Sequence, residues 1–301
     1  MSGCSGSAKS IGHAGELLQG VVRIGLRPEP FLVTLPAPPF ISHAIIRDSE
    51  DLHDHVQPPW KSKALRAARI AWARLEGPDR SLRLIIDSSM PVGRGCGSST
   101  SDCVAAIRAV ADLLDRSISA NEIAQWSAEA EIAADATMFD LRPVAFSQRR
   151  GRVLRPLGAA YPAMRVIAVD LGGPPVDSVA RPSPAYSGAE IAQFQNLLAV
   201  LEKSIERRDV SGVARVATES AAIQQRHYPH PRWNDFVATI RRADVLGVAC
   251  AHSGTVAVAL LGETAAEEQI AHDLEVTDLP VLARYELVPE RKGEAIACLS
   301  F

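Results

Sequence analysis

The amino-acid sequence predicts an α+β protein whose chain is long enough for two closely packed halves. Its 301 residues are 47% hydrophobic and 22% charged, a composition that supports a large folded core. Helical and strand-like segments are mixed along the chain, but they do not alternate regularly as they do in doubly wound parallel sheets. We place the boundary near residue 160, which gives domains at 1–160 and 161–301, with the proline-rich stretch 172–184 as an alternative connection.

Apolar periodicity defines the elements expected in the first half. Leu65, Ala68 and Trp72 fall on one helical face, whereas Leu82 and Leu84 alternate with polar residues as in a strand. A serine at position 119 is well placed to cap the helix that follows it. In chain order we expect a strand at 31–34, a helix at 61–75, a strand at 82–86, and helices at 99–114 and 121–134.

The second half shows the same mixture of patterns. Ile191, Leu198 and Ile205 mark the apolar stripe of a long helix. In chain order we expect a strand at 164–169, helices at 191–205, 213–225 and 233–246, a strand at 255–261, a helix at 265–274, and closing strands at 285–288 and 295–301.

Composition and charge argue against several classes of protein. Lys and Arg number 32 and Asp and Glu 35, so a net charge of −3 does not attract nucleic acid or an anionic membrane. No apolar run is long enough to cross a bilayer, and residues 1–10 read as an irregular lead-in and not as a signal peptide. Five cysteines without C-x-x-C spacing argue against a disulfide framework or a zinc site. We expect a cytoplasmic monomer or homodimer.

The residues that suggest chemistry lie in one segment between a predicted strand and a predicted helix, Pro91-Val92-Gly93-Arg94-Gly95-Cys96-Gly97-Ser98-Ser99-Thr100. Its glycines lack a Cβ, so the backbone can approach an anion and adopt positive φ. The following helix offers unpaired N–H groups and the positive end of its dipole. The hydroxyl groups can donate to phosphate or coordinate a cation. This combination predicts a binding site for nucleotide phosphates.

Two common phosphate motifs do not fit this segment. No Gly-Lys-Ser/Thr follows the glycines, so the segment is not a Walker A loop. The acidic residue that binds ribose in a dinucleotide fold is absent at the expected distance. The pattern P-x-G-x-G-x-G-S-S-T instead resembles the central motif of the GHMP kinases, the superfamily of galactokinase, homoserine kinase and mevalonate kinase.

Further stretches resemble one branch of that superfamily, the L-threonine kinases of cobalamin biosynthesis. They are residues 12–20, 60–64, 169–173, 176–178, 217–221 with Gln224 and Gln225, and 251–255. The resemblance implies a two-domain GHMP-kinase-like architecture, in which an N-terminal mixed sheet with helices packs on a C-terminal ferredoxin-like α/β sandwich. It also implies that ATP binds at residues 91–100.

The resemblance further implies a magnesium site and a catalytic base. Ser99 is similar in position to the serine that touches Mg²⁺, and the second ligand is a Glu on the following helix, for which Glu131 is better placed than Glu129. Both would supply the hard oxygen ligands that Mg²⁺ prefers. Asp135 matches the base of a Glu-Pro-Thr-Asp segment, but the Glu is displaced by one because Ile132 occupies its literal position.

Substrate contacts are expected from two other stretches, of which the first faces the substrate in relatives and the second forms a turn beside the phosphates or the substrate. Glu16 and Gln19 lie in the first, where a carboxylate could pair with an amino group. His13 lies near the position of a lysine in mevalonate kinases, and His252 and Ser253 replace a glycine-rich motif. Each of these residues also has an ordinary explanation, as a turn acid, a structural histidine or a plain turn.

The resemblance thus predicts a kinase that uses ATP and Mg²⁺ to convert L-threonine to O-phospho-L-threonine. Asp135 would orient or deprotonate the acceptor hydroxyl for in-line transfer. Homoserine, serine or another small alcohol is the alternative acceptor. A catalytically inactive nucleotide-binding regulator is the alternative class, and the displaced Glu keeps it open.

Overall fold

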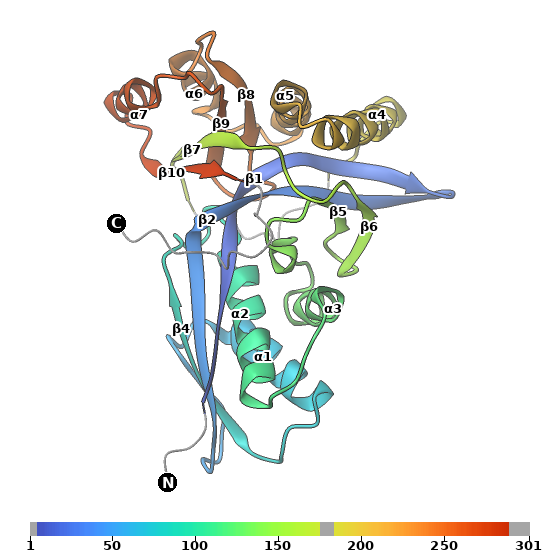
Figure 1. Ribbon diagram of the computed structural model, residues 1–301, viewed down its shortest axis with the longest axis vertical. Coiled ribbons are helices and arrows are strands. Elements are labelled where there is room, and N and C mark those ends of the chain that lie inside the picture. The colour runs from blue at the N-terminus through green and yellow to red at the C-terminus, as the bar shows by residue number, and fades with distance from the viewer. Residues whose placement is uncertain (1–4, 175–183, 289–301) are drawn as a thin grey trace.

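The structure is a computed structural model that describes residues 5–174 and 184–288. Figure 1 shows an elongated molecule in which two halves share a pair of long strands. Strands β1 (Gly6–Ile24) and β2 (Arg27–Ser49) pair in antiparallel fashion along nearly their whole length and run through both halves. The fold is mixed α+β, as the sequence predicts.

Strand β1 is irregular in its middle, between the two halves. Its register with β2 shifts between His13 and Glu16, and again between Glu16 and Leu18. Bulges of this kind re-aim side chains and occur often beside active sites. Gly15 has a φ of +76°, and a Cβ there would lie 2.8 Å from the backbone carbonyl carbon of Cys250 on a neighbouring strand. A glycine at this position therefore allows β1 to approach the second half closely.

The first half packs three helices against a mixed sheet. Its further elements are β3 (His55–Gln57), α1 (Ser62–Arg74), β4 (Ser81–Ser88), α2 (Ser98–Leu113) and α3 (Ala120–Glu131). The strand order here is β1-β2-β4-β3, with β3 parallel to β4. Helix α2 is buried on nearly every side between the sheet and the other two helices, so it is held rigidly in the centre of this half.

A small hairpin extends the first half beside β2. It consists of β5 (Val144–Ser147) and β6 (Arg152–Pro156), and it joins the sheet where Phe146 pairs with Leu32. The short 3-10 helix η1 (Thr137–Phe139) precedes the hairpin. The turn between β5 and β6 is thereby placed close to the irregular middle of β1, because Leu32 also pairs with Gln19.

The second half has the strand order of a ferredoxin-like fold. Its elements are β7 (Met164–Asp170), α4 (Gly188–Glu206), α5 (Val210–His227), α6 (Trp233–Thr239), β8 (Val245–Cys250), β9 (Val256–Leu261), α7 (Glu267–Val276) and β10 (Val281–Leu287). The order β10-β7-β9-β8 is fully antiparallel, as in a β-α-β-β-α-β unit. Helices α4 and α5 pack on one face of these strands, and α6 and α7 pack on the other.

Several expected elements need correction. Residues 6–10 are not an irregular lead-in, because they open β1 and pair with β2 from Gly6 opposite Ile46. The expected helix at 233–246 ends at Thr239, since Val245 and the residues after it pair with β9 as strand β8. Helix α3 ends at Glu131 because Ile132 adopts a left-handed φ of 75°. The expected strand at 295–301 and the motif at 176–178 lie outside the described residues.

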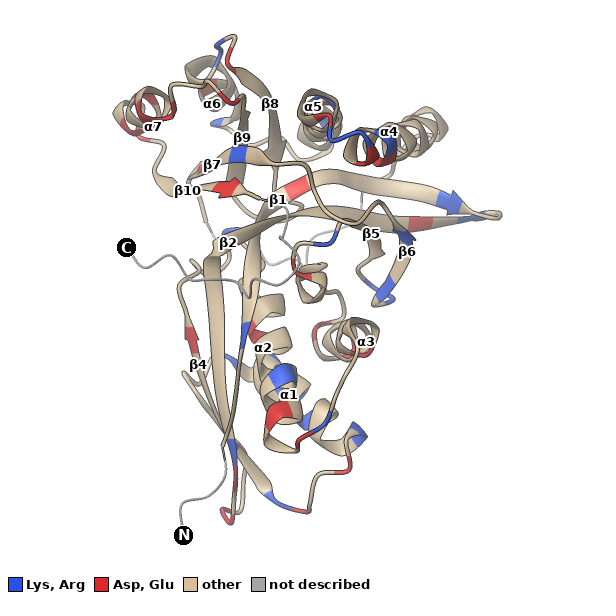
Figure 2. Cartoon of the chain, viewed as in Figure 1, with Lys and Arg blue, Asp and Glu red and all other residues tan. Residues whose placement is uncertain are grey.

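Charged residues are interspersed along the elements of both halves. Figure 2 shows basic and acidic residues mixed on helices and strands of the described ranges, with no element carrying one sign along its whole length. Within those same ranges, no helix combines the length and the hydrophobicity that crossing a membrane requires.

Candidate active site

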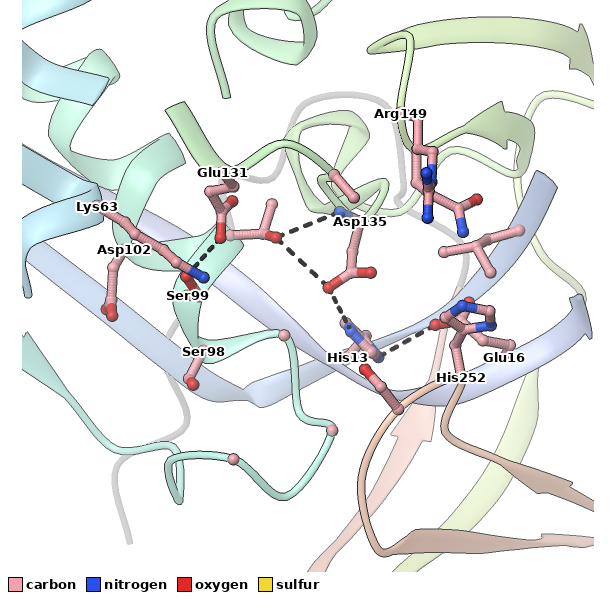
Figure 3. A pocket seen from close by; sticks show the side chains of 18 of the residues that line it. His13, Glu16, Lys63, Ser98, Ser99, Asp102, Glu131, Asp135, Arg149 and His252 are labelled. Carbon is pink, nitrogen blue, oxygen red and sulfur yellow. Dashed lines mark hydrogen bonds and ion pairs between the residues drawn. The ribbon is translucent and has the colours of Figure 1, made fainter. Parts of the chain in front are cut away.

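A cavity of about 420 Å³ lies where the two halves meet. Its lining comes from β1, β2, the start of α1, the glycine-rich loop, the start of α2, the segment after α3, the β5–β6 turn and residues 252–253. Figure 3 shows these side chains pointing toward one another from elements that are far apart in sequence. Its size is within the usual range for small-molecule sites.

The glycine-rich loop forms one wall of the cavity with its backbone. Gly93, Gly95 and Gly97 have φ values of +74°, +89° and +69°, which only glycine adopts readily. Gly97 is also the N-terminal cap of α2, and a Cβ there would lie 2.3 Å from the His13 ring. The first helical bond runs from the Ser101 amide to the Gly97 carbonyl, 2.9 Å, so the N–H groups before it have no partner within the helix.

The ten residues expected to bind ATP divide into two groups. Those that line the cavity are Val92, Gly93, Gly95, Gly97, Ser98, Ser99 and Thr100. Pro91, Arg94 and Cys96 are outside the lining. The Arg94 guanidinium donates to the Gly173 carbonyl at 2.6 Å and pairs with Asp170, and so fixes the loop to the second half.

Cys96 faces the core and not the cavity. It is 1% exposed, and burial, with the nearby charge of Asp170, raises the pKa of its thiol to about 12. Its carbonyl accepts a hydrogen bond from the His13 amide at 3.0 Å. The residue therefore connects the loop to β1, and its thiol stays protonated and unreactive.

Ser99 and Glu131 meet at the mouth of α2. The Ser99 hydroxyl donates to Glu131 Oε2, and the second oxygen of this carboxylate, Oε1, is buried without a hydrogen-bond partner among the described residues. Burial raises the pKa of Glu131 to about 7, against the opposing effects of the Ser99 hydrogen bond and the Lys63 charge. An orphaned carboxylate oxygen beside a hydroxyl is a donor set that fits Mg²⁺.

Glu129 does not reach the cavity. Its carboxylate pairs with Arg74 at 3.3 Å on the surface, where its side chain is 49% exposed. Although Glu129 and Glu131 are two residues apart on one helix, only Glu131 faces the glycine-rich loop. Of the two candidate carboxylate ligands for Mg²⁺, Glu131 therefore lies at the cavity and Glu129 does not.

Asp135 lies beside the same helix mouth, on the segment that follows α3. Its amide donates to the Thr100 hydroxyl at 3.2 Å, and its Oδ2 is 3.1 Å from His13 Nε2. Burial raises the pKa of Asp135, but the positive charge and hydrogen bond of His13 outweigh it and hold the pKa below its ordinary value. This carboxylate is therefore ionised at neutral pH and able to accept a proton or a hydrogen bond.

His13 connects Asp135 to a second carboxylate, Glu16. The ring is 3% exposed, and burial alone would lower its pKa, but the two carboxylates raise it to about 9. His13 Nδ1 lies 3.7 Å from Glu16 Oε1. The three side chains can place ligand atoms within 4.8 Å of one another, a spacing that would also suit a cation. A protonated imidazole, however, already supplies that positive charge.

Glu16 is a buried carboxylate that lines the cavity. It is 1% exposed, and neither oxygen has a hydrogen-bond partner in the described part of the chain. Burial raises the pKa of Glu16 to about 8, against the opposing charge of His13. An acceptor of this kind is costly to bury unless a ligand pairs with it.

Gln19, His252 and Ser253 complete one side of the cavity in different ways. His252 and Ser253 line it, whereas Gln19 lies behind them. Gln19 Oε1 contacts His252 Nδ1 at 2.9 Å, and Gln19 Nε2 donates to the Cys250 carbonyl at 3.1 Å. Gln19 thus positions the loop of His252 and does not itself face the ligand space.

Several lining residues carry no local signal in the sequence. Trp60 is 70% exposed at the cavity, Lys63 lies close enough to influence Glu131, and Gln148 and Arg149 come from the β5–β6 turn. Trp60 and Lys63 stand in the stretch 60–64, which resembles the L-threonine kinases but for which the sequence predicts no site residue. Gln148 and Arg149 stand in an arginine-rich run that looks like an ordinary solvated turn.

The fold and the site together define a class: a two-part α+β protein with an anion-binding helix mouth at its central cavity. Residues 62–148 match the family described as GHMP kinases N terminal domain. The resemblance to the GHMP kinases seen in the sequence is therefore confirmed over this part of the chain.

Individual relatives agree with this assignment. The chain is 24% identical over 179 residues to an L-threonine kinase from Citrobacter freundii, covering 59% of this chain and 61% of that protein. Its fold is similar to a homoserine kinase from Cytophaga hutchinsonii, with a TM-score of 0.68 and 14% identity over 94% of this chain and 95% of the other. It is also similar to a mevalonate kinase from Staphylococcus aureus, with a TM-score of 0.61 and 17% identity over 94% and 98%.

Proposed function

We propose that this protein is an ATP-dependent kinase that phosphorylates the hydroxyl group of an amino acid, L-threonine, to give O-phospho-L-threonine. The observation that carries the proposal is the convergence of two pairs, Ser99 with Glu131 and His13 with Asp135, at the mouth of α2. The similarity to an L-threonine kinase over 61% of that protein's length supports the choice of acceptor.

The nucleotide would bind with its phosphates at the glycine-rich loop. The unpaired N–H groups at the start of α2 and the positive end of its dipole favour a polyanion there. Ser98 and Thr100 line the same wall, and the Ser98 hydroxyl adds a donor there. These groups are fixed before the nucleotide arrives, so they can stabilise charge on the transferring group without reorganisation.

Ser99 and Glu131 would hold Mg²⁺, which would neutralise negative charge on the phosphates during transfer. Their geometry fits that role, because the buried Oε1 of Glu131 has no hydrogen-bond partner in the described part of the chain and the Ser99 hydroxyl is directed at the same carboxylate. The positive charge of Lys63 favours the ionised form of Glu131. The chain's own contribution is therefore a prepared pair of hard oxygen ligands.

Asp135 would act on the acceptor hydroxyl. As the hydroxyl oxygen bonds to the γ-phosphorus, its proton passes to Asp135, and the bond from phosphorus to the β–γ bridging oxygen breaks to release ADP. His13 keeps Asp135 ionised and aimed through their 3.1 Å contact. Positioning supplies most of the rate enhancement in such transfers, so the rigidity of α2 matters as much as the base.

Glu16 supports an amino-acid acceptor over a simple alcohol. Its buried oxygens, which accept no hydrogen bond from the described residues, would pair with an ammonium group, which a simple alcohol lacks. Homoserine and serine carry the same ammonium, so they remain the alternative acceptors. An inactive nucleotide-binding regulator is the alternative class, because Ile132 stands where relatives have their Glu.

An ADP-release assay with ATP and Mg²⁺ tests the proposal over L-threonine, L-serine, L-homoserine and mevalonate. We expect the highest kcat/KM with L-threonine and little ADP with mevalonate. ATP binding without turnover of any acceptor would reject the kinase and favour the regulator. A higher kcat/KM for homoserine or serine would retain the kinase and reject the proposed acceptor.

A further inference from the structure

The β5–β6 turn brings an unassigned cation to the cavity. Figure 3 shows Arg149 directed toward the space beside Asp135 and Glu16. The turn is arginine-rich, with Arg149, Arg150 and Arg152 in close succession. Arg149 is the one of these three that lines the cavity.

Contacts on both sides fix this turn. Arg150 pairs with the buried carboxylate of Glu29 at 3.0 Å, while Arg152 lies exposed on β6. Gly151 packs so tightly on α3 that a Cβ would lie 2.4 Å from the Ala124 carbonyl oxygen. A turn held by an ion pair and by close backbone packing presents its remaining arginine in a defined place.

The same turn is joined directly to the segment that carries the base. The amide of Ala134 donates to the Gln148 carbonyl at 3.0 Å, so Gln148 lies across from the residue that precedes Asp135. The side chain of Gln148 lines the cavity and is 7% exposed. Its Oε1 has no hydrogen-bond partner among the described residues, as is also true of both Glu16 oxygens.

Apolar residues lie between these polar groups. Val21, Pro30 and Leu32 line the cavity on β1 and β2. Leu32 pairs with Gln19 on one side and with Phe146 on the other, so it lies between the Glu16 strand and the turn of Arg149. This end of the cavity therefore has a carboxyl group, a guanidinium group and a short apolar surface between them, which together are complementary to a small zwitterion with a hydrocarbon body.

We propose that Arg149 binds the carboxylate of the acceptor while Glu16 binds its ammonium group, so that the site recognises an α-amino acid by both charged groups. This inference rests on the proposed function and adds a specificity residue on the β5–β6 turn. The guanidinium can donate two parallel hydrogen bonds to a carboxylate, which fixes the orientation of the acceptor as well as its affinity. The hydroxyl is then directed toward Asp135.

Truncated acceptors combined with variants test the assignment. L-Threoninamide lacks the carboxylate, and (R)-3-hydroxybutyrate lacks the ammonium group. We expect R149M to lower kcat/KM for L-threonine by about 10- to 100-fold and to change kcat/KM for L-threoninamide by less than about threefold. E16Q should lower kcat/KM only for the acceptors that carry an ammonium group, L-threonine and L-threoninamide. Its kcat/KM for (R)-3-hydroxybutyrate should stay the same.

R152M is the matched control, because Arg152 is exposed on the adjoining strand outside the cavity. It should match the unsubstituted protein with every acceptor. R149K should recover part of the L-threonine activity, since it keeps the charge but loses the bidentate geometry. An equal loss with L-threonine and L-threoninamide in R149M would overturn the proposal, because a structural role would affect both.

Calorimetric binding of L-threonine separates this inference from the kinase itself. If no acceptor is turned over but L-threonine binds and R149M weakens that binding selectively, the kinase is rejected and the two-charge site stands. If L-threonine binds equally to R149M and the unsubstituted protein, or binds to neither, the two-charge site is rejected. ATP binding by R149M serves as the measure that the fold is intact.

Discussion

The two ends of the cavity differ in whether backbone groups or side chains face the ligand space. At the end proposed to bind phosphate, the ligand groups would be backbone N–H groups of one loop and one helix start, with Gly93, Gly95 and Gly97 at positive φ. At the acceptor end, they are side chains from separate elements, including Glu16 on β1 and Arg149 on the β5–β6 turn. A backbone-built site tolerates little change in local conformation, whereas a side-chain-built site can change its ligand with single substitutions.

This difference suggests how one fold serves several acceptors. The phosphate end is contiguous in sequence and sits on a helix that is buried between sheet and helices. The acceptor end is assembled from a strand bulge, a hairpin turn and a loop, all of which can vary without disturbing that helix. Substitutions at the two ends should therefore separate into effects on transfer and effects on acceptor choice.

The largest effect is expected where the two ends meet, at Asp135. Asp135→Asn should lower kcat by about 10²- to 10⁴-fold, because the amide cannot accept the hydroxyl proton. ATP affinity should change little, because Asn keeps the size of Asp135 and the backbone amide that donates to the Thr100 hydroxyl is unchanged. Steady-state kinetics with a thermal-unfolding control measure this, and near-normal turnover by a folded variant would remove the base role.

The next largest effect tests the phosphate end through a matched pair on α3. Glu131→Gln should raise the Mg²⁺ concentration needed for half-maximal turnover by at least about 10- to 100-fold. This is the range seen when even an outer partner of a metal is lost. Glu129→Gln is the control, because Glu129 pairs with Arg74 on the surface. Equal Mg²⁺ titration curves for the two variants would contradict the assignment of Glu131.

The same contrast explains what the sequence could predict. The glycine-rich end could be predicted from the sequence because its glycines, hydroxyl-bearing residues and helix are consecutive. The structure places Ser98, Ser99 and Thr100 at the cavity. Helix α3 and its Ser119 cap follow from periodicity and a capping box, which is present. Such features depend on neighbours in the chain, so a local pattern is sufficient to reveal them.

The acceptor end could not be read in this way. Gln148 and Arg149 approach Glu16 only because β5 pairs with β2 and β2 pairs with β1, and register over such separations has no local signal. The same limit applies to residues 6–10, whose polar and small side chains hide a strand that is stabilised by pairing with β2. Residue roles at this end rest on the structure and on the resemblance of the β1 motif.

A smaller effect is expected at the outer rim of the nucleotide side. Trp60 is 70% exposed and lines the cavity, as does Val92 at 59% exposure. Trp60→Ala should raise the KM for ATP by about five- to tenfold, near the lower end of what base–aromatic stacking contributes. Its acceptor KM should stay the same. Leu52→Ala is the control, because Leu52 is 92% exposed and lies outside the cavity lining. Equal ATP KM values for both variants would exclude stacking on Trp60.

The smallest effect, a pH dependence, belongs to the acceptor end alone. The pKa of Glu16 is raised to about 8, so the free protein carries a mostly protonated Glu16 at neutral pH, and binding an ammonium group favours the ionised form. Between pH 7 and 8 the ionised fraction of Glu16 rises about fivefold, and the KM for L-threonine should fall by a similar factor. Of the groups facing Glu16, His13 stays protonated below its pKa of about 9, and Asp135 stays ionised because its pKa is lowered.

Two controls separate Glu16 from a general effect of pH. The KM for ATP should not change in this way with pH, and Glu16→Gln should remove the pH dependence of the KM for L-threonine. If the KM for L-threonine in the unsubstituted protein is constant from pH 7 to 8, or if it rises, Glu16 does not bind the ammonium group.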